Sequence, residues 1–329
     1  MKAIKRGFFR SIGAPGVAFL ALTAALVLAG PQAAWAKKDH TSANAVDPTS
    51  VTACGTLSGS NTIYQLANDL TESGTGTCIT MTGSNSTLDL FGYNITGPGA
   101  TSTGAGINIT SAANEDVIEG FSGTISKFEY GILDQANNTV GDNVTLEDNL
   151  VGLELNGTSG SATEMWSNFS ADSNTDEGVY FNHCTDECMA TDFDASSTTA
   201  GPGVLITDSS GPRISVFTAT DNATYGVHVG CTSGCGTNSD VRVGDAPIGT
   251  STTPAVTGNK SDGIFLDASE STTHDEVFLI KASGNGVTSG YDLHDASSTC
   301  GDNQWVGNDW GTASADGVSS PACIPLVTF

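Results

Sequence analysis

The chain has 329 residues, of which 38% are hydrophobic, only 14% are charged and 40 are glycine. This composition excludes a disordered chain. It also disfavours a helical bundle, which needs runs of Ala, Leu, Glu and Lys, and it favours many short strands joined by tight turns. The 36 acidic residues outnumber the 11 basic ones and give a net charge of −25. We therefore expect no nucleic-acid partner, because phosphates require clustered Lys and Arg.

Residues 1–36 have the organisation of a secretory signal peptide. An apolar stretch covers 14–30, and Ala34-Trp35-Ala36 is a small-x-small cleavage site. The basic residues that precede the apolar stretch are Lys2, Lys5, Arg6 and Arg10. An uncleaved anchor is the alternative, but the apolar run is short for a bilayer and ends at Pro31. We expect export to the extracellular space, cell surface or periplasm, with no membrane association after cleavage.

The rest of the chain repeats one short motif, in which a glycine is followed by an apolar, a variable and another apolar residue. Its copies are Gly106–Ile109, Gly131–Asp134 (the weakest), Gly152–Leu155, Gly178–Phe181, Gly203–Ile206, Gly226–Val229, Gly263–Leu266 and Gly290–Leu293. Successive glycines lie 21 to 27 residues apart, with one step of 37. A second alternating run, such as Val144–Leu146, falls between copies. Such a unit cannot bury its own apolar face and must stack on its neighbours.

The turn before each motif also repeats. Asn174, Asn222 and Asn259 lie four residues before a motif glycine and Asn149 lies three before, while Lys127 takes this place in the weakest copy. Asn tolerates the left-handed backbone region because its short amide bonds locally. We interpret these residues as a structural Asn ladder at one turn of a solenoid.

A period in the twenties with two or three short strands is typical of a parallel β-helix. A leucine-rich repeat would show a Leu/Asn consensus and a helical half, and a propeller would need longer blades. The sequence thus predicts an all-β, right-handed parallel β-helix of about nine to ten coils. We expect residues 37–50 to form a flexible N-terminal segment and 51–329 to form one β-helix domain with a C-terminal cap.

The first coils carry a family resemblance. Its residues are Cys54-Gly55, Tyr64–Leu66, Asp69-Leu70, Cys78–Met81, Thr87–Leu90, Gly92 and Ile95–Gly97. They resemble the opening coils of secreted, pectin-lyase-like parallel β-helix repeat proteins, and the later repeats are similar to that family's units. The resemblance covers about residues 51–311 and implies the fold. It implies no activity, because the fold hosts lyases, hydrolases, epimerases and adhesins, and no position here matches a catalytic motif.

The eight cysteines fall into four local pairs. We expect Cys54–Cys78 and Cys300–Cys323 to staple the two ends of the solenoid, where unpaired strand edges need covering. Cys184–Cys188 and Cys231–Cys235 are then two small disulfide loops, because export favours oxidation. The alternative is a single zinc site made by those four thiolates, or by thiolates together with His183 and His228. We predict no metal, although a Ca²⁺ ion on the acidic surface stays open.

The variable residue of each motif points outward, because strand side chains alternate. The chemically useful members of this row are Glu154, Tyr180, His228, Phe265 and Asp292. Aromatic rings for stacking, together with carboxylates and an imidazole, are what a glycan groove would contain. The alternative is an ordinary solvated face.

The leading functional hypothesis is contact with extracellular polysaccharide, by binding or by lyase- or hydrolase-type processing. A lyase needs a cation beside the uronate carboxylate, and no tight basic cluster is readable. A hydrolase needs two carboxylates, which are too abundant here to single out a pair. Whether the protein is an enzyme therefore stays open. The rival hypothesis is a non-catalytic structural, adhesin or cell-surface assembly protein. The sequence does not indicate an oligomeric state.

Overall fold

A computed structural model describes residues 47–99, 102–157, 164–185, 188–230, 238–244, 253–267, 274–296, 303–310 and 324. The chain divides into residues 1–45, which lie outside this described part, and a unit of residues 46–329 that contains the strands of the described part. The expected signal peptide therefore falls outside the described residues. Within the described residues, no helix has the length and apolar character needed to cross a membrane.

Ten short strands stack in one parallel sheet, which we call the ten-stranded sheet. They are β2 (Gly55–Leu57), β5 (Ile79–Met81), β8 (Ala105–Ile109), β11 (Tyr130–Asp134), β14 (Val151–Asn156), β16 (Glu177–Asn182), β18 (Val204–Thr207), β20 (Val227–Val229), β23 (Ile264–Leu266) and β26 (Leu293–Asp295). In most of these strands, inward-facing apolar residues alternate with outward-facing ones, while β11 and β26 place a buried aspartate, Asp134 or Asp295, at an inward position.

The other strands form an 18-stranded sheet, which is also parallel throughout. They are β1 (Thr49–Val51), β3 (Ile63–Leu66), β4 (Leu70–Thr71), β6 (Thr87–Asp89), β7 (Ile95–Thr96), β9 (Val117–Glu119), β10 (Thr124–Ser126), β12 (Val140–Asp142), β13 (Thr145–Glu147), β15 (Met165–Ser170), β17 (Met189–Asp194), β19 (Arg213–Thr220), β21 (Arg242–Val243), β22 (Ala255–Thr257), β24 (Glu276–Phe278), β25 (Lys281–Ser283), β27 (Gln304–Val306) and β28 (Asp309–Trp310).

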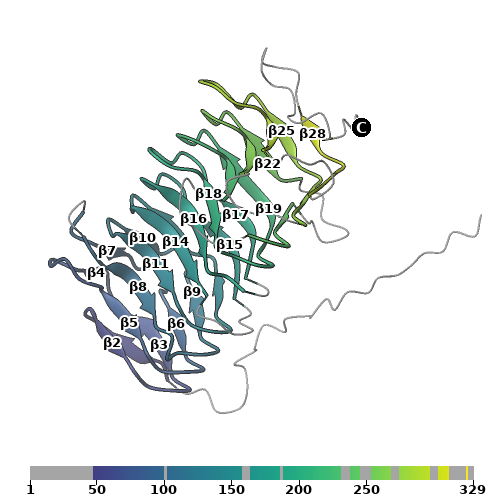
Figure 1. The fold of residues 1–329 in the computed structure, drawn as a ribbon. Coiled ribbons are helices and arrows are strands. Elements are labelled where there is room, and N and C mark those ends of the chain that lie inside the picture. The colour runs from purple at the N-terminus through teal and green to yellow at the C-terminus, as the bar shows by residue number, and fades with distance from the viewer. Residues whose placement is uncertain are drawn as a thin grey trace, which may run out of the picture. The chain divides into compact units, whose positions relative to one another are not determined.

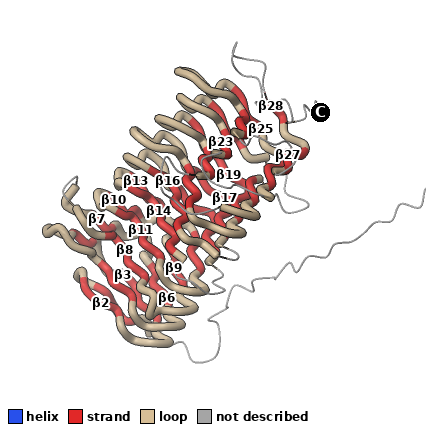
Figure 2. The backbone as a smooth tube through the Cα atoms, in the orientation of Figure 1, coloured by secondary structure: helices blue, strands red, loops and turns tan. Residues whose placement is uncertain are grey.

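Each turn of the chain, here called a rung, contributes one strand to the ten-stranded sheet and one or two strands to the 18-stranded sheet. Figure 1 shows successive rungs stacked in chain order, and Figure 2 shows that strand and turn alternate with no helix among the described residues. The parallel β-solenoid of about nine turns confirms the predicted fold. Its first strand begins at Thr49.

The core is a set of apolar columns that run from rung to rung. One column follows the centre of the ten-stranded sheet and has no exposed surface; its members are Ile107, Ile132, Leu153, Val179, Val204, Val227, Ile264 and Leu293. A second column stacks Phe169, Phe193 and Phe217, with ring centroids 5.1 and 5.5 Å apart. Each side chain packs on the equivalent side chain of the next rung, so the same strand pattern recurs in successive rungs.

The recurring asparagines form a buried hydrogen-bonded ladder. The side chain of Asn222 accepts from the backbone N–H of Thr198 and donates to the carbonyl of Ala195, and its own N–H donates to Asn259. Asn149 and Asn174 make the equivalent bonds earlier in the chain. The left-handed residue at each turn is instead the preceding one, such as Asp148 at φ 56° or Asp221 at φ 57°. The backbone tolerance of Asn is therefore not the reason for its recurrence; the reason is its two-sided amide.

The ladder also explains the motif glycine. A Cβ placed on Gly203 would lie 2.6 Å from the Nδ2 of Asn222, and one on Gly263 would lie 2.6 Å from the Nδ2 of Asn285. The Asn side chain thus occupies the space that any other residue would need, so the glycine and the asparagine recur as a pair.

Two cysteine pairs lie in the described part. Cys54 and Cys78 join the first two rungs through sulfur atoms 2.03 Å apart, and Cys184 bonds to Cys188 within one turn. The N-terminal staple and one small loop therefore pair as expected. The remaining cysteines, Cys231, Cys235, Cys300 and Cys323, lie outside the described residues.

Candidate functional site

The outer face of the ten-stranded sheet carries the row of side chains predicted from the motif. The strand register aligns Glu154 with Tyr180, and further along the row aligns His228 with Phe265. Leu205 connects the two halves, because it pairs with Tyr180 on one side and with His228 on the other. Four of the five expected residues therefore share one face.

The last rung departs from the expected register. The partner of Phe265 is His294, and Leu293 pairs with Ile264. Asp292 lies in the buried turn before the strand, where its Oδ1 accepts from the backbone and side-chain nitrogens of Asn285. The sequence motif at Gly290 is thus out of step by two residues, and Asp292 ends the Asn ladder rather than contributing to the outer face.

The C-terminal half of the face carries an aromatic cluster, which we define as Tyr225, His228, Phe265, Tyr291 and His294. The ring of Phe265 lies at its centre, with centroids 5.1 Å from Tyr225, 5.2 Å from His228 and 4.7 Å from His294. Tyr291 contacts His294 at 4.9 Å. Most of these rings are partly exposed, and His228 is buried. Such a platform offers flat apolar surface with polar edges, which suits stacking on a sugar ring.

Each histidine of the aromatic cluster faces a carboxylate. The Nδ1 of His294 lies 3.2 Å from Asp262, and the Nε2 of His228 lies 3.6 Å from Asp267. Burial lowers the pKa of His228, although the nearby Asp267 works in the opposite direction. His228 is therefore neutral at pH 7 and can act as a hydrogen-bond donor and acceptor toward hydroxyl groups.

The N-terminal half of the face carries a carboxylate cluster, which we define as Tyr130, Glu154, Glu177 and Tyr180. The Oε1 of Glu154 accepts hydrogen bonds from Asn156 at 3.0 Å and from Asn182 at 3.1 Å. Burial raises the pKa of Glu154, and it raises the pKa of Glu177 to about 7, assisted by the charges of Asp176 and Glu154. Burial and the surrounding carboxylates raise the pKa of Tyr130 to about 12. Two carboxyl groups on one face therefore titrate above their ordinary range.

The described strands of the ten-stranded sheet contain no Lys or Arg. The described Lys and Arg residues lie instead on the 18-stranded sheet or in turns; they are Lys127, Arg213, Arg242, Lys260 and Lys281. Arg242 is paired with Glu276 at 2.8 Å. The face is therefore acidic and offers no cation that could neutralise a bound uronate.

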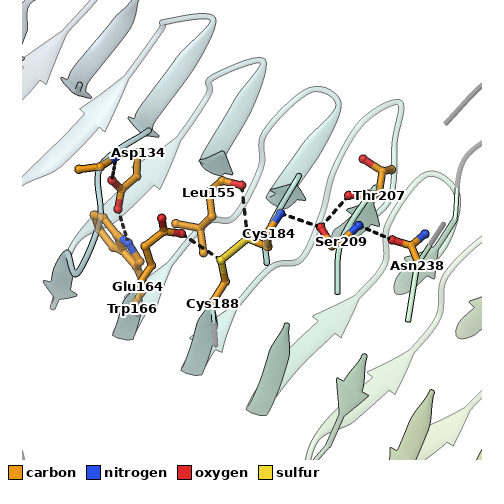
Figure 3. Close-up of a disulfide and its surroundings, with 10 residues drawn as sticks. Asp134, Leu155, Glu164, Trp166, Cys184, Cys188, Thr207, Ser209 and Asn238 are labelled. Carbon is orange, nitrogen blue, oxygen red and sulfur yellow. Dashed lines mark hydrogen bonds between the residues drawn. A yellow bond between two sulfur atoms is a disulfide. The ribbon is translucent and has the colours of Figure 1, made fainter. Parts of the chain in front are cut away.

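A column of buried polar groups passes through the interior beside Cys184–Cys188 (Figure 3). Trp166 donates its indole N–H to Asp134 at 3.1 Å, and Glu164 lies 3.1 Å from the sulfur of Cys188. Burial raises the pKa of Asp134 to about 7 and that of Glu164 to about 9. Because a disulfide sulfur carries no hydrogen, the protonated Glu164 is the donor in this contact. Its other oxygen has no hydrogen-bond partner.

The alternative zinc site is not assembled by its described members. Cys184 and Cys188 are fully buried and bonded to each other, the side chain of His183 is 62% exposed beside Asp208, and His228 faces the outer surface. Cys231 and Cys235 lie outside the described residues. Glu164 lies with Cys184 and Cys188 in the one group of three close ligand atoms found in the described part. The disulfide removes both of these sulfur atoms as metal ligands.

The sequence reasoning missed Glu177, Tyr225, Tyr291 and His294. Tyr225 and His228 are three residues apart, so strict alternation places them on opposite faces, yet their rings are 4.6 Å apart. The motif glycine between them interrupts the pairing, as the register at Tyr130 and Ile132 also shows. Glu177 and Tyr225 could have been found from their place just before a motif glycine, whereas Tyr291 and His294 are brought to the face by the two-residue shift of the last rung.

Comparison with known proteins places the fold. No family model matches the chain, and no curated protein matches by sequence. Among solved structures, the A-module of the Azotobacter vinelandii mannuronan C-5 epimerase AlgE4 aligns with a TM-score of 0.60 at 16% identity. The alignment covers 80% of this chain and 75% of the AlgE4 A-module chain. The Dettilon tailspike protein gp208 aligns at 0.61 and 14%, over 82% of this chain and 60% of its own.

The AlgE6 A-module of Azotobacter vinelandii aligns at a TM-score of 0.55 with 14% identity, over 83% of this chain and 86% of its own. These neighbours are pectin-lyase-like parallel β-helix proteins, so the resemblance stated from the first coils is confirmed at the level of fold. The protein is thus a parallel β-helix whose outer face is aromatic and acidic.

Proposed function

We propose that the protein is exported and binds an extracellular polysaccharide on the outer face of its ten-stranded sheet. The single observation that carries this proposal is the aromatic cluster, in which Phe265 contacts Tyr225, His228 and His294. Sugar rings present C–H faces that pack on aromatic rings, and their hydroxyls hydrogen-bond to imidazole and carboxylate edges. The fold likeness to an epimerase of mannuronan and to tailspikes gives general support for a polysaccharide partner.

Charge narrows the class of polysaccharide. The face has Glu154, Glu177, Asp262 and Asp267, and none of the described basic residues lies on its strands. A polyuronate would meet like charge there, so a neutral chain fits better, unless Ca²⁺ bridges the carboxylates. The proposed ligand is therefore an uncharged polysaccharide.

Affinity electrophoresis through gels that contain neutral or uronate-rich polysaccharides, with and without Ca²⁺, tests the proposal. We expect retention in at least one neutral gel, and Phe265→Ala and His294→Ala should each weaken it. Val306→Ala is the matched control, because Val306 is 49% exposed and belongs to β27 of the 18-stranded sheet. If no gel retains the protein, the polysaccharide proposal fails and a purely structural rod is favoured.

A second candidate is hydrolysis of the bound chain, and the carboxylate cluster is the observation that favours it. Burial raises the pKa of Glu177 to about 7, and it also raises the pKa of Glu154. A glycosidase needs one protonated and one ionised carboxyl group on either side of the bond. New reducing ends that Glu154→Gln or Glu177→Gln abolishes without loss of gel retention would establish hydrolysis. Unsaturated ends that absorb ultraviolet light would establish a lyase instead.

A further inference from the structure

The 18-stranded sheet bends sharply within each middle rung at one left-handed residue. These residues are Asn143, Asn168, Asp192 and Val216, with φ between 48° and 58°. The register stacks them, because Ser167, Thr191 and Ser215 pair just before the bend and the three stacked phenylalanines pair just after it. Strands β15, β17 and β19, which contain three of the bends, lie side by side (Figure 1).

A groove of about 530 Å³ follows this column, and we call it the bend groove. Its lining consists of Asn143–Thr145, Asn168–Ser170, Asp192–Asp194, Val216–Thr218 and Thr253. The volume falls within the range of small-molecule pockets. The bend groove lies on the 18-stranded sheet, so it is separate from the aromatic cluster.

The chemistry of the lining selects against charged polymers and metals. Asp192 and Asp194 contribute carboxylates, Asn143 and Asn168 contribute amides, and the rest of the polar surface is hydroxyl. Among the described residues that line the groove there is no Lys or Arg, so they offer a polyanion no counter-charge. The described part also holds no group of three close metal-ligand atoms in this groove. Amides, hydroxyls and carboxylates side by side suit a ligand that is itself rich in hydroxyl groups.

The groove is also repetitive. Each rung adds one bend residue and one hydroxyl or carboxylate at the same level, and the phenylalanine centroids beneath them step by 5.1 and 5.5 Å. A compact ligand would use only one or two of these levels. A linear polymer, whose hydroxyl groups recur along its length, can engage every rung that the groove crosses.

An exposed aromatic pair extends the column toward the N-terminus. Phe91 and Phe121 are 59% and 50% exposed, and both have left-handed backbones, which is unusual for bulky residues. The turn of Phe121 is bonded to the next rung, since Gly120 donates to the carbonyl of Asp142 at 3.0 Å. Exposed aromatic side chains held in a strained conformation point to a binding role.

We propose that the bend groove binds one chain of an uncharged glycan, with Phe121 stacking on a sugar ring at the groove's N-terminal end. Hydroxyl groups of the glycan bond to Asn168, Asp192 and their copies in neighbouring rungs. This second site goes beyond the function proposed for the ten-stranded sheet, and either site can exist without the other.

The test is calorimetric titration of the full chain with cellohexaose and mannohexaose, and with hexagalacturonate as the charged counterpart. All variants are made in a Phe265→Ala background, which disables the aromatic cluster. We expect that background to bind one of the neutral hexasaccharides. Ser170→Trp, which fills the groove, and Phe121→Ala should each weaken the remaining binding at least tenfold.

Leu279→Ala is the matched control, because Leu279 is an exposed left-handed residue at the same bend outside the groove lining. It should leave affinity unchanged. Circular dichroism checks folding, and Asn168→Arg at an exposed position replaces Ser170→Trp if that variant unfolds. The proposal is overturned if the Phe265→Ala background binds neither neutral hexasaccharide, which leaves the outer-face function intact. It is also overturned if hexagalacturonate binds equally well, or if Phe121→Ala alters only the oligomeric state.

Discussion

At the scale of single residues, the bends of the 18-stranded sheet show which residue types adopt a left-handed backbone easily and which do so under strain. Asn and Asp enter the left-handed region at little cost, whereas a β-branched residue does so only under strain. Val216 is the one β-branched residue at a positive φ among the described bends. Its neighbours in the column, Asn168 and Asp192, show the residue types that the conformation prefers.

We therefore predict that Val216→Asn stabilises the protein. Relief of the strained backbone should contribute about 1 kcal/mol, equivalent to a rise of about 2–4 °C in the thermal midpoint of a domain of this size. Differential scanning calorimetry measures the change. Thr218→Asn, on the same strand with an ordinary backbone, should give no rise. A lower midpoint for Val216→Asn would contradict the strain argument.

At the scale of elements, the Asn ladder connects the turns of successive rungs. Asn222 is fully buried, and it satisfies the Thr198 N–H and the Ala195 carbonyl at once. We predict that Asn222→Ala destabilises the protein by about 3 kcal/mol, because two buried backbone groups lose their partners. Urea unfolding measures the loss. Asn168→Gly, at an exposed left-handed position, should change stability little, and an equal loss in both variants would argue against the ladder.

The stacked repeat and most of the outer row could be predicted from the sequence. The periodic glycines and asparagines identify the solenoid, because stacking repeats the same steric demand in every rung. The outward row follows from alternation alone, which is why Glu154, Tyr180, His228 and Phe265 fall together. The register of the last rung could not be predicted, because the sequence that begins at Gly290 matches the motif but lies two residues away from the position that pairs with the other copies. Tyr225 and Glu177 escaped prediction because the pairing irregularity at the motif glycine turns a second residue outward.

At the scale of the whole molecule, buried acids link stability to pH. Burial raises the pKa of Asp116 to about 6, of Asp275 to about 7 and of Glu164 to about 9. The folded state therefore binds these protons more tightly than the unfolded state does. Their stabilising contribution is full below the ordinary carboxyl pKa and is lost as pH rises through the raised values. The lowered pKa of His228 has the opposite effect: it reduces stability as the pH falls below the ordinary pKa of histidine.

We accordingly predict a thermal midpoint several degrees higher at pH 5 than at pH 8 at constant ionic strength. The net charge of −25 adds to the trend, because ionising further carboxyl groups increases self-repulsion. Glu164→Gln keeps the shape of the side chain and cannot ionise, so it should raise the midpoint at pH 8 and narrow the difference between the two pH values. Exposed Glu147→Gln is the control and should leave the difference unchanged. A midpoint that is equal or higher at pH 8 would show that the buried carboxyl groups do not govern the stability of the solenoid.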